Sequence, residues 1–138
     1  MKKSVERGGP ECPEWIDQRD ALAIHDRLAA IEGSACGVRD MGLLESALAR
    51  PQQLFTYGKK PGIAELAAAY MVGIIRNHPF IDGNKRTGFV IGVLFLELNG
   101  YRFMASEEDA AQAVLSLADG SFGEDALAAW IQANAKRQ

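Results

Sequence analysis

The side chains best suited to chemistry are concentrated in residues 78–88, which read HPFIDGNKRTG. This run contains a histidine, an aspartate, an asparagine, a lysine and an arginine, and apolar segments flank it on both sides. Placing so many polar groups between two apolar segments is unfavourable unless the groups are solvated or serve a function such as ligand binding or catalysis. We therefore take residues 78–88 as the candidate functional site.

The second half of this run has the features of a phosphate site. Gly83 precedes Asn84, where we expect a helix to begin. The first turn of a helix carries unpaired N–H groups and the positive end of the helix dipole, and a glycine before it lets an anion approach closely. Arg86 can add a bidentate contact to phosphate, and Lys85 can add a point charge. These four residues are the predicted phosphate-binding residues.

Two other residues of the run supply groups for a reaction. His78, at the end of the preceding apolar segment, can act as a general base near neutral pH. Asp82 offers hard carboxylate oxygens that can hold Mg²⁺ against the same phosphates. A base, a metal ligand and a phosphate cradle therefore fall within residues 78–86, which indicates phosphoryl or nucleotidyl transfer.

Each of these residues also has an ordinary structural interpretation. Asp82 or Asn84 can cap a helix, Gly83 can serve a turn, Phe80 can plug the core and His78 can end a helix. It is their combination in one run that favours a functional site. A Walker A loop is excluded, because Phe and Val follow the second glycine where Lys and Ser/Thr are required.

The bulk properties exclude several other classes of function. The chain has 138 residues, of which 48% are hydrophobic and 24% charged, as is typical of one globular domain. The net charge is −3 and the basic residues are scattered, so no direct nucleic-acid interface is expected. The longest apolar run, residues 89–96, is far shorter than the roughly 20 residues that span a bilayer, so no membrane segment is expected. Cys12 and Cys36 give neither a disulfide framework nor a zinc spacing, which agrees with a cytoplasmic protein.

The elements that must position this run are predicted to be helices. No segment alternates convincingly with period two, so the expected fold class is all-α, a single domain without a sheet of any size. Two central apolar helices are joined by the candidate loop, and the second of them, apolar on nearly every side, is expected at the buried centre. The expected helices cover residues 18–31 (capped by Asp17, stopped by Gly33), 41–50 (capped by Asp40, closed by Pro51), 63–77 and 84–99, with two final helices begun by Ser106 and Ser121 that end near residues 131 and 135.

The remaining segments are expected to be irregular. Residues 1–14 are rich in Gly, Pro and charge and are predicted to form a flexible tail, so the domain covers residues 15–138. Residues 51–62 have Pro and Gly at both ends and are predicted to form an exposed flap that carries Phe55 and Tyr57. Residues 101–103 are expected to be briefly extended.

The candidate run resembles the signature of the Fic/Doc family, H-x-F-x-(D/E)-G-N-x-R. Residues 37–51, which read GVRDMGLLESALARP, and residues 22–26, which read LAIHD, are similar to the Doc branch of that family. On an amphipathic helix we favour a structural or surface role for His25. The resemblance spans nearly the whole domain, and it implies these roles: His78 as the base that deprotonates a hydroxyl on a target protein, Phe80 as the anchor of the loop, Asp82 as the Mg²⁺ ligand, Gly83 and Asn84 as the anion hole, Arg86 as the phosphate ligand, and Phe55 and Tyr57 of the flap as contacts to the target.

The family resemblance also bears on which group is transferred. Most Fic proteins transfer AMP from ATP and have a glycine after the asparagine and a second arginine three residues after the first. This chain has Lys85 and Phe89 at those positions, and its N-K-R-T is similar to the Doc pattern. The resemblance therefore implies a toxin that binds ATP in reverse and phosphorylates a Thr of elongation factor Tu, so that translation and growth stop.

The same resemblance implies a small antitoxin that acts in trans. Two alternatives stay open at this point. One is AMP transfer to a protein hydroxyl, and the other is a non-catalytic co-regulator that binds the antitoxin.

Overall fold

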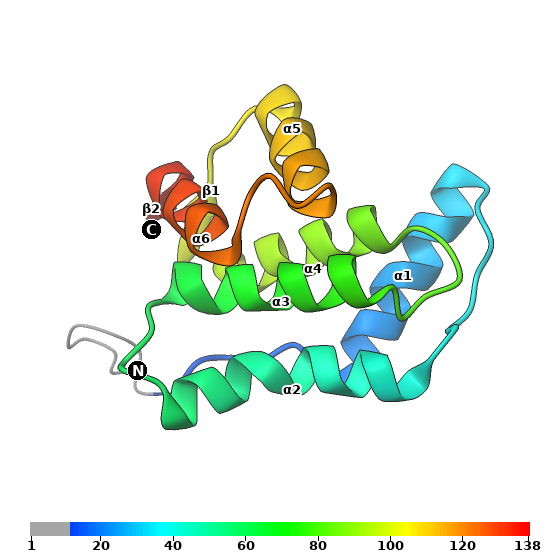
Figure 1. Ribbon diagram of the computed structural model, residues 1–138, viewed down its shortest axis with the longest axis horizontal. Helices are drawn as coiled ribbons and strands as arrows, with labels where there is room; N and C mark the ends of the chain where they lie inside the picture. Colours follow the sequence, from blue (N-terminus) through cyan, green and yellow to red (C-terminus); the bar gives the residue numbers. More distant parts are fainter. Residues whose placement is uncertain (1–11) are drawn as a thin grey trace.

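The computed structural model describes residues 12–138, and residues 1–11, most of the expected tail, lie outside the described part. The described chain is built almost entirely of helices, with one small antiparallel strand pair (Figure 1). None of the described helices is long and apolar enough to cross a membrane. The elements are α1 (Gln18–Glu32), α2 (Met41–Tyr57), α3 (Ile63–Asn77), α4 (Asn84–Leu98), β1 (Tyr101–Phe103), α5 (Glu107–Ala118), α6 (Glu124–Asn134) and β2 (Ala135–Arg137).

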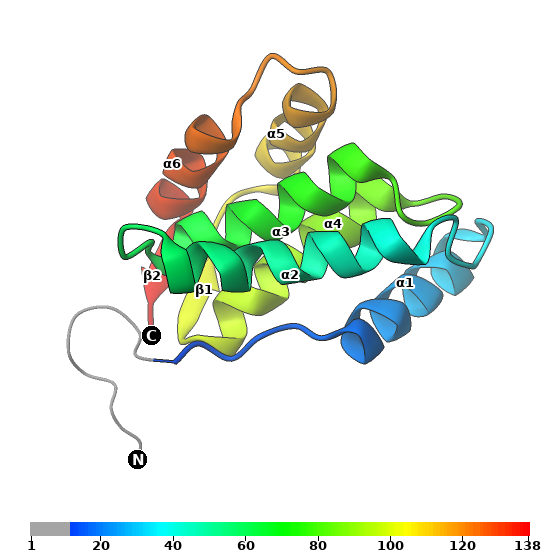
Figure 2. The ribbon, with the colours of Figure 1, turned by 60° about the horizontal axis from the view of Figure 1, so that its bottom comes forward.

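Helix α3 is the centre of the fold. It lies between α2 on one side and α4, α5 and α6 on the other, while α1 crosses the end of the bundle at which α3 and α4 are joined (Figures 1 and 2). Almost all of α3 is buried from Ile63 to Ile75. Its alanines and Gly73 let the neighbouring helices approach closely, since Gly73 faces Ala47 of α2. The expectation that residues 84–99 form the buried centre is therefore wrong, because one side of α4 stays half-exposed.

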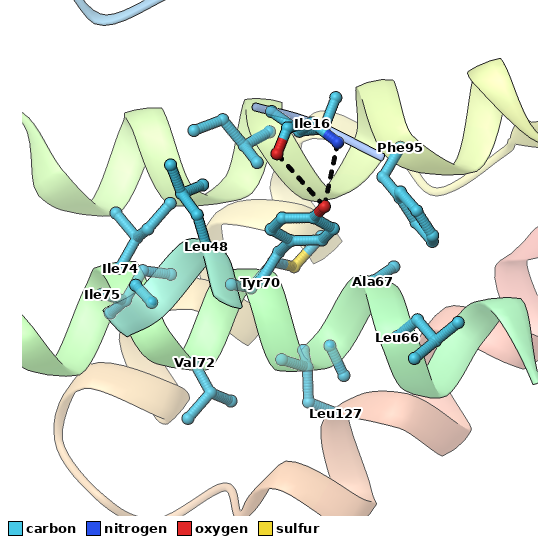
Figure 3. Packing of buried hydrophobic residues seen from close by; sticks show 14 of the residues in the cluster. Ile16, Leu48, Leu66, Ala67, Tyr70, Val72, Ile74, Ile75, Phe95 and Leu127 are labelled. Carbon is cyan, nitrogen blue, oxygen red and sulfur yellow. Dashed lines mark hydrogen bonds between the residues drawn. The ribbon is translucent and has the colours of Figure 1, made fainter. Parts of the chain in front are cut away.

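The core also holds the N-terminal segment in place. The hydroxyl of the buried Tyr70 accepts a hydrogen bond from the N–H of Ile16 at 2.9 Å and donates one to its carbonyl at 3.4 Å (Figure 3). Burial is the main cause that raises the pKa of Tyr70 to about 12. Nearby, the side chain of Asn99 bonds both the N–H and the carbonyl of Glu14, and Pro13 is buried. Packing of the described chain thus begins at Pro13, two residues before the expected domain boundary.

The strand pair is short. β1 pairs antiparallel with β2, with Tyr101 opposite Arg137 and Phe103 opposite Ala135. The expected extended segment at residues 101–103 is confirmed, and its partner at the end of the chain was not predicted. A pair of three-residue strands leaves the all-α prediction of the fold class correct.

Helix α2 is longer than expected. It continues through Pro51, which is buried inside it, and ends at Tyr57. The predicted flap is therefore wrong for residues 51–57, which are helical, and correct for residues 58–62, which are irregular and mostly exposed. A proline inside a helix removes one hydrogen bond and clashes with the preceding turn. Here Leu54 and Phe55 pack against the core from the next turn, and this burial offsets the loss.

Several predicted helix ends are confirmed by their hydrogen bonds. Asp17, Asp40 and Ser106 each accept a backbone N–H at the start of α1, α2 and α5, and Gly33 ends α1 in a left-handed conformation. The predicted cap at Ser121 is wrong. The hydroxyl of Ser121 donates to Asp119 and to the carbonyl of Ser116, and the residue that directly precedes α6 is Gly123. Helix α5 is also shorter than predicted, because it ends at Ala118 and not near residue 131.

The buried face of α1 also differs from the expected one. Leu22, Ile24 and Leu28 are half-buried, and Ile31 is 72% exposed. The residues of α1 that are fully buried are Ala21, His25 and Ala29. Small residues on this face bring the helix close to its neighbours, and His25 comes to lie against the candidate loop.

Candidate active site

The loop starts where α3 ends, at His78. This residue has φ 52° and ψ 55°, in the left-handed region that histidine visits more often than most residues, and its N–H still donates to the carbonyl of Ile74. Such a conformation costs on the order of 1 kcal/mol and persists only where the surroundings hold it. The helix therefore stops abruptly, Pro79 follows, and the side chain of His78 is exposed at the start of the loop.

Phe80 anchors the loop in the core. Its ring is fully buried and lies parallel to the ring of His25, with 4.0 Å between the ring centroids and 4° between the planes. The side chain of Asn84 brackets its backbone: Oδ1 accepts from the N–H of Phe80 at 2.9 Å, and Nδ2 donates to its carbonyl at 3.0 Å. The amide of Asn84 thus braces the loop, and the backbone N–H of this residue is left for an anion.

A segment far away in sequence runs beside the loop. Val38 forms an antiparallel bridge with Phe80, the N–H of Ile81 donates to Gly37, and the carbonyl of Pro79 accepts two N–H groups of residues 39–40. This pairing holds the loop along the start of α2. Sequence reasoning missed it, since one isolated bridge leaves no alternating pattern to detect.

Arg39 of the same segment caps the end of α3. Its guanidinium donates to the carbonyl of His78 at 2.7 Å through Nε and to the carbonyl of Asn77 at 2.9 Å through Nη2. A cation at a helix C-terminus satisfies the last carbonyls and is favoured by the helix dipole. Arg39 therefore stabilises the turn that presents His78. The only sign of this role in the sequence is that Arg39 directly precedes the helix cap Asp40.

His25 supports the loop from the opposite side. Its side chain is 2% exposed, and its Nε2 lies 2.8 Å from the carbonyl oxygen of Asp82, to which it donates. Of the two roles expected for His25, the structure shows the structural one. The single hydrogen bond fixes the peptide between Asp82 and Gly83, where the predicted metal ligand and the predicted phosphate site meet.

The predicted phosphate site is the exposed N-terminus of α4. Gly83 has φ 76°, a left-handed conformation that favours glycine, and its carbonyl accepts the first hydrogen bond of the helix from Thr87. Within the described chain, the N–H groups of Asn84, Lys85 and Arg86 have no hydrogen-bond partner. Three unpaired N–H groups at the positive end of a helix dipole are suited to bind an anion.

Asp82 meets the requirements for a magnesium ligand. Its side chain is exposed, and Oδ1 accepts the N–H of Gly83 at 2.8 Å, which orients the carboxylate beside the start of α4. The described residues hold no group of three or more His, Cys, Asp and Glu side chains that would form an all-protein metal site. Mg²⁺ is commonly bound by one or two carboxylates together with substrate phosphates and waters, so a single aspartate fits it.

Arg86 forms an ion pair with a carboxylate of the same chain. Its Nη2 lies 2.7 Å from Oε2 of Glu32 at the end of α1, and the two side chains are 56% and 33% exposed. An exposed ion pair of this kind contributes at most about 1 kcal/mol. A phosphate group can therefore displace the carboxylate of Glu32 and take the same guanidinium.

Phe55 and Tyr57 do not join these residues. The loop contacts the beginning of α2, whereas the two aromatics lie in its last turn, and 17 residues of helix separate its ends by about 25 Å. Phe55 packs edge-on against Trp15, and Tyr57 is 85% exposed. Both aromatics thus lie at the end of α2, and Figure 1 shows this end of α2 on the opposite side of the bundle from the loop between α3 and α4. They are not part of the site that we propose.

Comparison with known proteins agrees with this arrangement. Residues 15–96 match the model of the Fic/DOC family, so the chain belongs to the Fic/Doc family. It is 37% identical over 93 residues to the Toxin Doc of Mycolicibacterium smegmatis, a match that covers 67% of this chain and 69% of that protein. It is 33% identical over 93 residues to the Protein kinase doc of Escherichia phage P1, which covers 67% of this chain and 74% of that protein.

Proposed function

We propose that this protein is a cytoplasmic Doc-type toxin that transfers the terminal phosphate of Mg·ATP to a Thr of elongation factor Tu and thereby arrests translation and growth. The observation that carries the proposal is the cluster at the start of α4, where three unpaired N–H groups, Arg86 and Asp82 lie in one loop with His78. The names of the two relatives, a toxin and a protein kinase, support this choice.

In the proposed reaction, each group of the loop has one task. The imidazole of His78 accepts the proton of the target hydroxyl, whose oxygen forms a bond to the terminal phosphorus while the bond from that phosphorus to ADP breaks. The N–H groups of residues 84–86 and the guanidinium of Arg86 bind the phosphate oxygens on which charge is spread. Asp82 would hold Mg²⁺, which when bound neutralises charge on the phosphates.

Two residues favour phosphate transfer over the alternative, AMP transfer. The position three residues after Arg86, where the Fic pattern has a second arginine to orient a leaving pyrophosphate, is the apolar Phe89. Lys85 stands where that pattern has a glycine, and its side chain is exposed in the first turn of α4, where we propose that the phosphates bind. The cations of α4 are therefore confined to its first turn.

The position of the label in ATP tests the proposal. Purified protein is incubated with elongation factor Tu and Mg·ATP labelled at either the α or the γ phosphorus. We expect label to pass to a Thr of the factor from the γ position alone. Transfer from the α position would establish AMP transfer instead. Transfer from neither position, by a folded protein that still binds a Doc antitoxin, would favour the non-catalytic co-regulator.

We further propose that a small antitoxin restrains this enzyme in trans. The relative from Mycolicibacterium smegmatis is named a toxin, and a toxin must be silenced in the cell that makes it. Expression of the wild-type chain alone is expected to arrest growth, and co-expression of the antitoxin is expected to restore it. Normal growth with the chain alone at high level would contradict this.

A further inference from the structure

The backbone conformation of His78 is opposed by the residue that follows it. His78 has φ 52° and ψ 55° in the left-handed region, and Pro79 comes directly after it. The ring of a proline disfavours helical conformations of the preceding residue and pushes it toward an extended one with a negative φ. The local sequence alone would therefore make His78 extended, and contacts from elsewhere in the chain must hold the left-handed conformation.

These contacts come from Arg39 and Asp40, at the end of the bundle where the start of α2 meets the loop between α3 and α4 (Figure 1). The guanidinium of Arg39 donates to the carbonyl of His78 at 2.7 Å and to the carbonyl of Asn77 at 2.9 Å. The backbone N–H groups of Arg39 and Asp40 donate to the carbonyl of Pro79 at 2.7 Å and 3.0 Å. Three consecutive carbonyls around His78 are thus held by two adjacent residues of a distant segment.

The guanidinium of Arg39 joins the two peptide planes that define φ and ψ of His78. One plane contains the carbonyl of Asn77 and precedes the α-carbon of His78, and the other contains the carbonyl of His78 and follows it. In an extended chain successive carbonyls point in opposite directions, so one planar guanidinium cannot bond both of them. The two hydrogen bonds of Arg39 are therefore compatible with the left-handed conformation and are lost in the extended one.

Resting on the proposed function, in which His78 accepts the proton of the target hydroxyl, we propose that Arg39 is a positioning residue for this reaction. It holds His78 in the left-handed conformation and so sets the direction in which the imidazole leaves the backbone. Without Arg39, His78 relaxes toward the extended conformation that Pro79 favours, and its φ changes by more than about 100°. A displacement of about 1 Å in a reacting group can cost on the order of 10²-fold in rate. Arg39 acts only through His78, so its loss slows transfer and leaves the binding of ATP as it is.

Two substitutions of Arg39 and one matched control test the proposal. Arg39→Ala removes both side-chain hydrogen bonds, and Arg39→Lys keeps the charge but not the planar fork. Arg76→Ala is the control, because Arg76 is exposed in the last turn of α3 and donates to the carbonyl of Phe122 at 3.3 Å. It removes an arginine from the same helix end without a contact to His78. Far-UV circular dichroism checks that each variant is folded.

A double-mutant cycle shows whether Arg39 acts through His78. The cycle consists of the wild type, Arg39→Ala, His78→Ala and the protein with both substitutions. Two residues that act as a unit are not additive in such a cycle. Steady-state transfer from γ-labelled Mg·ATP to elongation factor Tu gives kcat and both KM values, and crystal structures of the wild type and of Arg39→Ala give φ of His78.

We expect Arg39→Ala to lower kcat by roughly 10²-fold and to leave KM for ATP and for the factor within about twofold of the wild type. Arg39→Lys should lose an intermediate amount, about tenfold, because an ammonium group can bond one carbonyl well but not both. Arg76→Ala should transfer phosphate as the wild type does. Adding Arg39→Ala to His78→Ala should cost no further rate, and φ of His78 should be negative in Arg39→Ala.

Wild-type kcat in Arg39→Ala, or in Arg39→Lys if the alanine variant does not fold, would overturn the proposal. So would a further loss of rate when Arg39→Ala is added to His78→Ala, or a loss confined to KM for ATP. A wild type that transfers no phosphate would contradict the proposed function. The crystal structures would then decide on the positioning alone, and a positive φ of His78 in Arg39→Ala would refute it.

Discussion

Replacing His25 by alanine removes the support behind the loop. In the wild type, Nε2 of His25 donates to the carbonyl of Asp82 at 2.8 Å, and the ring lies flat on Phe80 with 4.0 Å between the centroids. The side chain is 2% exposed, so a truncation leaves a cavity and an unpaired carbonyl rather than a surface group in water. His25 itself has no place among the groups proposed to touch ATP or the target.

The size of the effect follows from these contacts. Loss of the hydrogen bond to a half-buried carbonyl costs roughly 1 to 1.5 kcal/mol, and loss of the stacked ring pair roughly another 1 kcal/mol. The cavity adds a similar amount, because a close-packed interior relaxes only in part. We therefore expect His25→Ala to lower the free energy of unfolding by about 3 kcal/mol.

Urea denaturation followed by circular dichroism measures this change. Arg27→Ala serves as the control, because Arg27 is exposed on the same helix and its loss should change stability by less than about 0.5 kcal/mol. The folded His25→Ala protein should also transfer phosphate more slowly, since the peptide between Asp82 and Gly83 is no longer fixed. A variant as stable and as active as the control would refute the role of His25 in holding the loop.

Three further perturbations have defined outcomes. A Cβ on Gly92 would lie 2.4 Å from Cε and 2.6 Å from Cγ of Met71, so Gly92→Ala should destabilise the fold by roughly 1 to 3 kcal/mol in thermal denaturation, and unchanged stability would contradict the close packing of α3 and α4. Burial raises the pKa of Tyr70 to about 12, above the value of about 10 in the unfolded chain. The stability that the neutral Tyr70 hydroxyl contributes is therefore complete below pH 10 and is lost as the pH rises from 10 to 12. The free energy of unfolding measured across that range should show this loss in the wild type and not in Tyr70→Phe. Glu32→Gln frees Arg86 of its ion pair and should tighten the binding of tripolyphosphate by a few fold, up to about fivefold, in calorimetry, while equal binding would mean that Arg86 does not contact the phosphates.

The features that sequence reasoning predicted are those decided by neighbours in the chain. Asp17, Asp40 and Ser106 cap helices through the N–H groups of residues three positions later, a signal contained in four consecutive residues. The candidate site is likewise one continuous run, so its helix N-terminus and its glycine turn were predictable from residues 78–88.

The features that it missed depend on contacts between distant parts of the chain. Nothing near Pro51 shows that burial of the next turn keeps α2 intact, and tertiary packing there outweighs the local preference. The hydrogen bond of His25 joins residues 57 positions apart, and Arg39 reaches the carbonyl of His78 from 39 positions away. Such supports become visible only when the fold brings α1 and the start of α2 to the loop.

The prediction of an exposed flap was wrong at residues 51–57 for a related reason. Phe55 was assigned to it because Pro and Gly flank residues 51–62, yet the ring belongs to the core, where it meets Trp15. Composition describes how a segment can fold in isolation, whereas the apolar side chains of α2 are stabilised by the surface of α3 that they cover.

The rate of phosphate transfer by a His78→Ala variant tests the central claim most directly. His78 is exposed, so its truncation should leave the fold intact, which circular dichroism checks. In single-turnover reactions with elongation factor Tu and γ-labelled Mg·ATP, we expect the variant to be slower by roughly 10²- to 10⁴-fold, the range typical of losing a general base, with ATP binding unchanged. A folded variant that transfers phosphate at the wild-type rate would contradict the assignment of residues 78–86 as the catalytic loop.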